Sequence, residues 1–262
     1  MCLLAFSWQN HSRYRFVFAG NRDEFHARPS AAANWWPDAP DVFGGRDLEA
    51  GGTWLGLRRD GRFAVVTNFR EPDVRPAGKR SRGELVGAFL SGTSPASAWL
   101  ADIETRADDY AGFNLLFGDV VRPGEPLLYF SNRDGIGGVA RRQAEPGIHA
   151  LSNHLLDTPW PKVQRLRESF VHELDRDEPR AEKLLEFLDD SEPARDDDLP
   201  STGLSPEWER RLSAAKIVSN DYGTRASTVV FVKNDGTCFF HERRFSSNGK
   251  IAGESRERFV AS

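Results

Sequence analysis

The second residue of the chain is a cysteine, and it begins an apolar run at residues 2–6 that is typical of a strand. Cysteine is small, so an initiator methionine before it is normally removed, which would leave a thiol and a free α-amine on Cys2. An unperturbed α-amine has a pKa of roughly 7.7–8.0 and a thiol roughly 8.5, so the amine can accept the thiol proton near neutral pH. The alternative is that Cys2 is a buried apolar residue, because free cysteines bury readily.

A run of polar side chains follows the next apolar segment, residues 14–19, directly after Gly20. If that strand continues, alternation places Asn21 and Asp23 on one face and Arg22 and Glu24 on the other. We expect some of these side chains to close over Cys2 from the neighbouring strand. The alternative is a solvated turn with an internal ion pair, since the similar run at residues 132–135 is typical of a plain hairpin turn.

Three further polar residues stand at the ends of predicted strands. Asn68 and Asn153 each end an apolar run, and a side-chain amide there can stabilise a developing oxyanion or simply cap a turn. Arg225 precedes a strand and can orient a substrate or hold a thiolate; the alternative is a surface arginine. Trp54 lies in a glycine-rich run, residues 51–56, which lacks the spacing of a phosphate loop and leaves room for a ligand beside the indole.

The composition excludes several classes of function. The net charge of −4 is spread over both signs, which argues against a nucleic-acid partner. Cys2 and Cys238 are far apart and form no disulfide framework, and the six histidines have no metal-ligand spacing, so we predict no metal and no cofactor. No apolar run approaches the roughly 18 residues of a membrane span, so we predict no membrane insertion. A reducing cytoplasm is the expected location.

The predicted elements favour a layered α+β domain that covers residues 1–262 without a linker. Hairpins are predicted at 2–8 with 14–19, at 53–58 with 62–69, and at 225–233 with 237–245. Further strands are predicted at 113–119, 126–131, 136–141 and 147–152, and a loop at 70–80. A capping box at Ser81 and Glu84 predicts a helix over 85–90, and other helices are expected at 94–106, 159–174, 179–189 and 207–215.

Together these residues resemble a known family. The ordered motifs closely resemble the NRDE family, which is the family of the transport and Golgi organisation protein 2, over nearly the whole chain. The resemblance implies the fold of N-terminal nucleophile hydrolases, a four-layer αββα sandwich of mainly antiparallel sheets. The motifs that carry it are Cys2, Gly20-Asn21-Arg22-Asp23-Glu24-Phe25, residues 51–56, Thr67-Asn68-Phe69-Arg70, Leu151-Ser152-Asn153 and Pro159-Trp160-Pro161-Lys162-Val163.

The chain is also distantly similar to choloylglycine hydrolases and penicillin V acylases, which cleave amide bonds with a cysteine freed by removal of Met1. Their two catalytic asparagines match Asn68 and Asn153, and their late arginine matches Arg225. At the second strand they carry Gly-Arg-Asn-x-Asp. A match without gaps places their arginine on Asn21 and their aspartate on Glu24, whereas here Arg22 and Asp23 supply that chemistry.

The resemblance implies a cysteine-dependent hydrolase of the N-terminal nucleophile class that acts on a small-molecule amide or thioester; if active, it would be an amidohydrolase for non-peptide C–N bonds. The alternative is a non-catalytic carrier of haem or an acyl lipid, so the expected partner is a small acyl substrate or haem. We also expect neighbouring arginines to lower the pKa of Cys2, and Cys238 to be inert. The predicted catalytic residues are Cys2, Arg22, Asp23, Asn68, Asn153 and Arg225, and the predicted ligand-binding residues are Asn21, Glu24 and Trp54.

Overall fold

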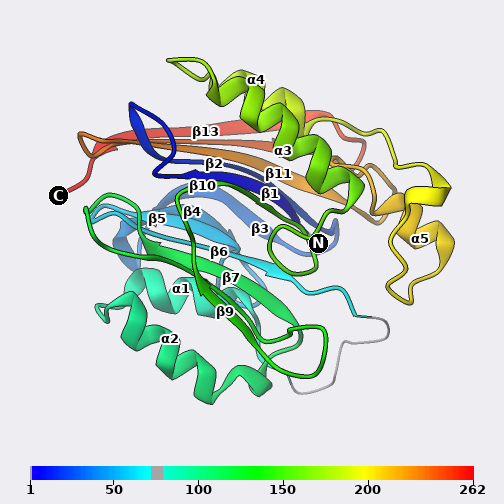
Figure 1. The fold of residues 1–262 in the computed structure, drawn as a ribbon, viewed down its shortest axis with the longest axis horizontal. Helices are drawn as coiled ribbons and strands as arrows, with labels where there is room; N and C mark the ends of the chain where they lie inside the picture. Colours follow the sequence, from blue (N-terminus) through cyan, green and yellow to red (C-terminus); the bar gives the residue numbers. More distant parts are fainter. Residues whose placement is uncertain (1, 72–78) are drawn as a thin grey trace.

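Two antiparallel sheets stacked face to face form the centre of the molecule in a computed structural model, which describes residues 2–71 and 79–262 (Figure 1). The six-stranded sheet has the order β10-β1-β2-β11-β12-β13, and the seven-stranded sheet has the order β3-β4-β5-β6-β7-β8-β9. The strands are β1 (Cys2–Trp8), β2 (Tyr14–Phe25), β3 (Ser30–Trp36), β4 (Ala39–Asp47), β5 (Leu55–Arg58), β6 (Arg62–Asn68), β7 (Phe113–Asp119), β8 (Leu127–Ser131), β9 (Ala140–Gln143), β10 (Gly147–Leu151), β11 (Tyr222–Lys233), β12 (Thr237–Phe245) and β13 (Ile251–Val260).

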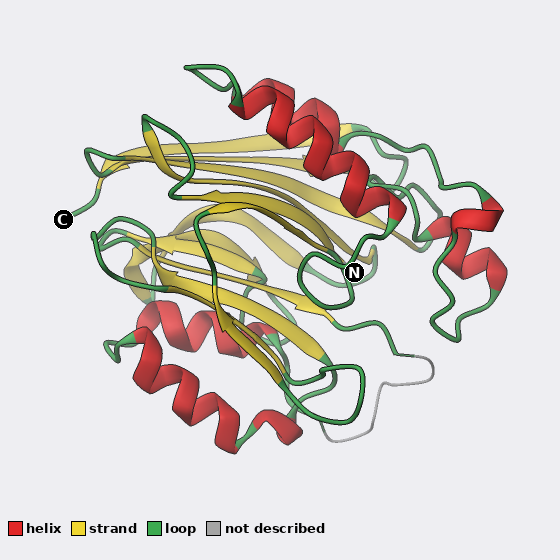
Figure 2. Ribbon diagram, in the orientation of Figure 1, coloured by secondary structure: helices red, strands yellow, loops and turns green. Residues whose placement is uncertain are grey.

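Helices cover the outer face of each sheet, as Figure 2 shows. One pair, α1 (Gly83–Ser91) and α2 (Ala96–Thr105), buries its apolar side against β6, β7 and β8 of the seven-stranded sheet. A second pair, α3 (Pro161–Leu174) and α4 (Ala181–Leu188), buries its apolar side against β1, β2 and β11 of the six-stranded sheet. A short helix, α5 (Pro206–Arg211), lies beyond the end of that sheet. The predicted αββα arrangement is therefore confirmed.

The three predicted hairpins are confirmed, because β1 pairs with β2, β5 with β6 and β11 with β12. Three strands were not predicted: β3, β4 and β13. The capping box was wrong: α1 begins at Gly83 with no side-chain cap, and Glu84 instead accepts from Arg80. Residues 72–78 of the predicted 70–80 loop, like the predicted removal of Met1, lie outside the described residues.

Strand alternation sorts the six-stranded sheet into two faces. In β1 and β2, Leu4, Phe6, Phe16 and Phe18 belong to the core between the sheets. Their neighbours Leu3, Ala5, Val17 and Ala19 pack against α3 and α4 instead. Because successive side chains point to opposite faces, the polar end of β2 presents different residues to the core and to the helices.

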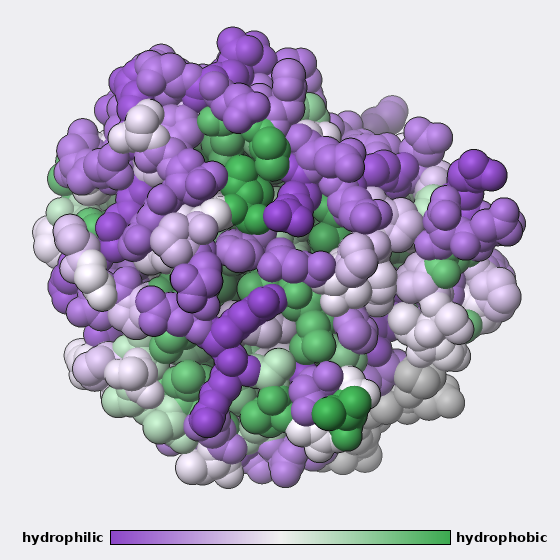
Figure 3. Space-filling view, in the orientation of Figure 1, coloured by the Kyte–Doolittle hydropathy of each residue, from purple (hydrophilic) through white to green (hydrophobic). Residues whose placement is uncertain are grey.

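Most of the surface seen in Figure 3 is hydrophilic, and its hydrophobic residues form separate patches. No helix in the described part of the chain is long and apolar enough to cross a membrane.

Candidate active site

Cys2 and Arg22 lie opposite each other on the core-facing side of neighbouring strands. They form a register pair between β1 and β2, and Arg22 also pairs with Ala226 of β11. The guanidinium lies over the Trp54 indole, 4.4 Å from the ring centroid. It is also 3.9 Å from the Glu24 carboxylate, while its Nη1 has no hydrogen-bond partner among the described residues. This arrangement leaves a donor of Arg22 available beside the thiol.

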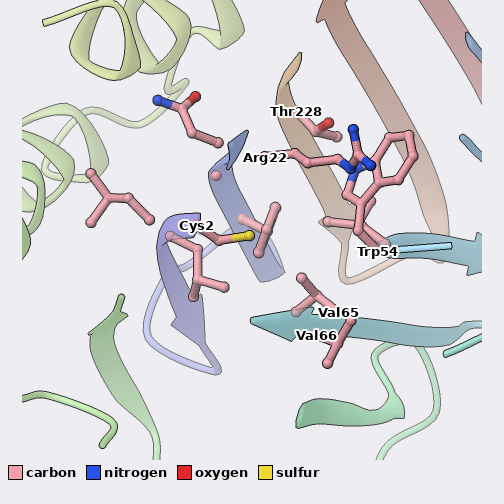
Figure 4. A pocket seen from close by; sticks show the side chains of 12 residues that line it. Cys2, Arg22, Trp54, Val65, Val66 and Thr228 are labelled. Atoms are coloured by element: carbon pink, nitrogen blue, oxygen red, sulfur yellow. The ribbon is translucent and has the colours of Figure 1, made fainter. Parts of the chain in front are cut away.

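A small cavity lies in front of these two residues (Figure 4). Its volume is about 10 Å³, room for about one water molecule. Trp54, Val66 and Thr228 contribute to its walls, and the sulfur of Cys2 lies on the side that faces them. Gly45 lies beneath Trp54, where a Cβ atom would come within 2.2 Å of the indole. The absence of a side chain at Gly45 therefore allows Trp54 to lie flat against Arg22.

Asn21 and Asp23 lie on the opposite face of the sheet, toward the helices. The amide of Asn21 donates to the carbonyls of Leu188 and Ala215, each at 2.8 Å, and accepts from Ser227 Oγ at 2.6 Å. Asp23 is buried and accepts from Thr224 Oγ1 at 2.6 Å. Asn21 is thus engaged in fixing the helices onto the sheet, although ligand binding was predicted for it.

Ser152 lies between Cys2 and Asn153, and its one hydroxyl proton has two acceptors within reach. Ser152 Oγ lies 2.9 Å from the carbonyl oxygen of Cys2 and 3.2 Å from Asn153 Oδ1. The side-chain amide of Asn153 donates to the carbonyl of Asn68 at 2.9 Å. Asn153 is fully buried. Its amide therefore holds the end of β6 to the turn after β10, while the side-chain amide of Asn68 makes no hydrogen bond to another described residue.

Arg225 lies at a bulge in β11, where the pairing with β2 shifts between Thr224 and Ala226. Its guanidinium donates to the carbonyls of Phe25, His26 and Arg28 at 3.0–3.2 Å. These bonds tie down the chain that leaves β2. The residues that line the cavity include Cys2, Asn21, Arg22 and Trp54 but not Asn68, Asn153 or Arg225.

The electrostatics differ from the sequence-based expectation. Burial raises the pKa of the Cys2 thiol, and the charge of Asp23 raises it further, while Arg22 and the backbone N–H of Asp23 lower it. Arg22 lowers this pKa as predicted, but desolvation outweighs it, so the expectation of a net lowered pKa is wrong. Burial also raises the pKa of Asp23 and of Tyr222, on the adjoining strand.

Sequence reasoning missed three buried charged residues, which are Arg70, Glu209 and Lys162. Arg70 is buried, and its Nη1 donates to Glu209 Oε2 at 2.6 Å. Its guanidinium also lies 4.4 Å from the ring centroid of Trp160, the residue before α3. Lys162, in the first turn of α3, is 2% exposed. The sequence carried one signal for the burial of Lys162. It stands next to Val163 and Leu166, whose spacing predicts the buried side of a helix.

We expect Cys2 to react before Cys238 when the protein is treated with limiting iodoacetamide. Cys238 is fully buried in the core between the sheets, and burial raises the pKa of its thiol to about 12. Cys2 is half-buried and lies at the cavity. Peptide mass spectrometry measures the labelling, and a preference for Cys238 would contradict this expectation.

No group of three or more histidine, cysteine, aspartate or glutamate residues suitable for a metal occurs in the part of the chain that the structure describes. The charged groups that act on the Cys2 thiol are instead those of Arg22 and Asp23. Such a set can carry out nucleophilic and proton-transfer chemistry.

Comparisons with known proteins agree on the family and the fold. The conjugated bile acid hydrolase of Clostridium perfringens, solved as a C2A mutant, superposes with a TM-score of 0.52 at 8% identity, covering 98% of this chain and 92% of that one. This likeness shows the N-terminal nucleophile hydrolase fold. The Transport and Golgi organization protein 2 homolog of Bos taurus is 34% identical, covering 93% of this chain and 92% of the relative. The Homo sapiens homolog is 31% identical, covering 98% and 97%. The family model Transport and Golgi organisation 2 matches residues 1–247, so the chain belongs to that family.

Proposed function

We propose that the protein is a cysteine-dependent hydrolase that transfers the acyl group of a small-molecule amide or thioester to water through Cys2. The observation that carries this proposal is the pairing of Cys2 with Arg22 at a cavity where Arg22 Nη1 has no described partner. A thiol that needs to ionise beside an unused cationic donor is suited to attack on a carbonyl.

The reaction would proceed in two steps. The Cys2 thiolate attacks the carbonyl carbon, the oxyanion of the tetrahedral intermediate forms, and the amine or thiol leaves with a proton. Water then attacks the thioester on Cys2 and releases the acid. Loss of one oxyanion donor in enzymes of this kind typically costs about 10²–10³ in rate.

The hydrogen-bond donors near Cys2 differ in whether another residue already engages them. Arg22 Nη1 lies at the cavity and is free of other described partners, which supports its role as a donor, whereas Asn68 does not line the cavity and its role rests on the resemblance. The amide of Asn153 is already bonded to the carbonyl of Asn68, so its proposed role is to position β6 and the turn after β10. For Asp23, the proposed role is to set the charge behind the thiol.

Mass spectrometry of the intact protein, incubated with a panel of N-acyl and acyl-thioester compounds, tests the proposal. We expect a transient acyl adduct on residue 2 that is absent from Cys2→Ala and greatly slowed in Cys2→Ser. Cys238→Ser is the matched control and should form the adduct as the unmodified chain does. No adduct across the panel, together with a stoichiometric Soret band on adding haem, would favour a carrier instead.

A further inference from the structure

The cavity in front of Cys2 is small compared with most acyl groups. Its volume of about 10 Å³ holds about one water molecule, and a methyl group needs a similar space. A carbonyl carbon at the sulfur carries two substituents, the acyl tail and the leaving group. One of them can extend to solvent past the half-buried thiol, and the other must enter the cavity or displace one of its walls. The walls therefore determine which substrates can reach Cys2.

Most of these walls are fixed by the two sheets. Among the residues that line the cavity, Cys2 and Trp54 are half-buried, and all the others are buried. The buried ones lie mainly on strands that have a neighbour on both sides, and close-packed interiors resist insertion of extra atoms. They include Leu4 of β1, Phe18 and Gly20 of β2, Leu55 of β5, Val65 and Val66 of β6, and Thr228 of β11 (Figure 4).

The side chain of Trp54 is the wall that can yield. Its backbone is fixed, because its carbonyl accepts from the N–H of Val66 at 2.9 Å. The indole N–H, however, makes no hydrogen bond with the described residues, whereas that of Trp35 donates to a carboxylate at 3.0 Å. The indole packs instead against Gly45 and the Arg22 guanidinium. Rotation of this side chain therefore breaks no hydrogen bond within the described part of the chain.

The tail of the acyl group suits the cavity better than the leaving group does. The leaving amine or thiol has to take up a proton and depart, which requires the solvent side of Cys2. The cavity is walled mainly by apolar side chains, such as Leu4, Val65 and Val66, beside the Arg22 guanidinium. A carbonyl oxygen that accepts from Arg22 Nη1 leaves the hydrocarbon tail to contact these walls. A charged tail would lose its hydration there.

We propose that Cys2 accepts a short, apolar acyl group of about acetyl size, and that the Trp54 indole sets this limit. This inference rests on the proposed acyl transfer and names the class of acyl group. The carbonyl oxygen faces Arg22, the tail fills the cavity, and the leaving group lies on the solvent side of the thiol. A longer tail collides with the indole, so it reacts only when the indole is displaced or removed.

Two substitutions at Trp54 and a matched control test this limit. Trp54→Ala removes the wall, and Trp54→Phe replaces it by a smaller ring. Trp35→Ala is the control, because Trp35 is also half-buried, packs against the same core and has the Arg59 guanidinium 3.7 Å from its ring centroid. Trp35 does not line the cavity at Cys2. The melting temperature of each full-length variant verifies that it folds.

The first measurement needs no acyl substrate. It compares the rates at which methyl and benzyl methanethiosulfonate modify Cys2, each relative to glutathione at the same pH, with the site read by peptide mass. The ratio of the two rates does not depend on the fraction of thiolate, so it reports space alone. We expect the methyl reagent to be favoured at least about tenfold in the unmodified chain and in Trp35→Ala. This preference should shrink in Trp54→Phe and disappear in Trp54→Ala. The same ratio in Trp54→Ala as in the unmodified chain would overturn the proposal.

The second measurement is the rate at which acetyl, butyryl and octanoyl thioesters of one simple thiol form the adduct on Cys2. In the unmodified chain, the acetyl compound should react at least about tenfold faster than the octanoyl compound, and Trp54→Ala should remove this difference. An octanoyl thioester that reacts as fast as the acetyl one in the unmodified chain would overturn the proposal. If no thioester forms an adduct in any variant, the proposed hydrolase function fails, and the thiosulfonate ratio still decides whether Trp54 limits access to Cys2.

Discussion

Replacing Glu209 by glutamine is expected to lower the free energy of unfolding by about 3–5 kcal/mol, the range seen when one partner of a buried ion pair is removed. The Arg70 and Glu209 side chains are 1% and 5% exposed, and they meet at 2.6 Å. Glutamine still accepts from Thr202 at Oε1, so the change removes mainly the charge that compensates Arg70. Two nitrogens of Arg70, Nε and Nη2, already have no partner among the described residues. Urea denaturation measures the loss.

Asp196→Asn is the matched control for this prediction. Its pair with Arg210 is solvent-exposed, and exposed ion pairs contribute little, so we expect no measurable loss. A double variant, Arg70→Met with Glu209→Met, should recover most of the lost stability, because two apolar side chains leave no buried charge. A Glu209→Gln protein as stable as the Asp196→Asn protein would contradict the buried pair.

Arg70, the buried partner of Glu209, also connects segments near the candidate site. Arg70 lies over Trp160, and its backbone N–H donates to the carbonyl of Asn153 at 2.6 Å. Trp160 precedes α3, whose first turn carries Lys162. Arg70 therefore joins the end of β6, the turn after β10 and the start of α3.

The faces of the central strands could be predicted from the sequence, because alternation is a local property. The polar run after Gly20 continues β2, so Asn21 and Asp23 share one face and Arg22 the other. The strands β3 and β13 could not be predicted in the same way. Each pairs with one neighbour only, at a sheet edge. Residues 251–260 are mostly exposed and rich in charge, and β3 is interrupted by register shifts, so neither has a clean apolar pattern.

The chemistry of the site depends on contacts that no spacing reveals. Asn153 ends its apolar run as predicted, but its amide is engaged by a carbonyl 85 residues away. The pKa of Cys2 rises because the fold removes water from it, an effect that the nearby Arg22 does not reverse. Lys162 lies near residues from β2, the end of β6 and α4, and the lack of a described hydrogen-bond partner for its Nζ emerges only from the packing of α3 on the sheet.

Replacing Lys162 by methionine is expected to raise the free energy of unfolding at pH 7 by about 3 kcal/mol, the equivalent of a pKa that burial lowers from 10.5 to about 8. Methionine fills a similar volume and leaves no buried charge. Burying an ammonium group without a partner is costly, so its removal stabilises the fold. The matched change, Lys216→Met, should give no gain, because it removes an amine that already contacts Asp189. Urea denaturation of both variants beside the unmodified chain makes the comparison.

The pH dependence of that gain distinguishes desolvation from better packing. Between pH 8 and 10.5 the unfolded chain keeps the proton of Lys162 while the folded chain has lost it, so this lysine makes the unmodified protein more stable as pH rises. Below pH 8 both states are protonated, and the full penalty is present. The advantage of Lys162→Met should therefore be constant below pH 8, shrink through pH 8 to 10.5, and approach zero above it. Groups that do not interact with Lys162 titrate alike in both proteins and cancel in this difference. A gain that stays constant up to pH 10.5 would mean that methionine simply packs better, and a loss at pH 7 would mean that the amine has a favourable partner. Either result would contradict a desolvated, unpaired Lys162, whereas a gain that vanishes over this range would show that the buried amine itself lowers the stability of the fold.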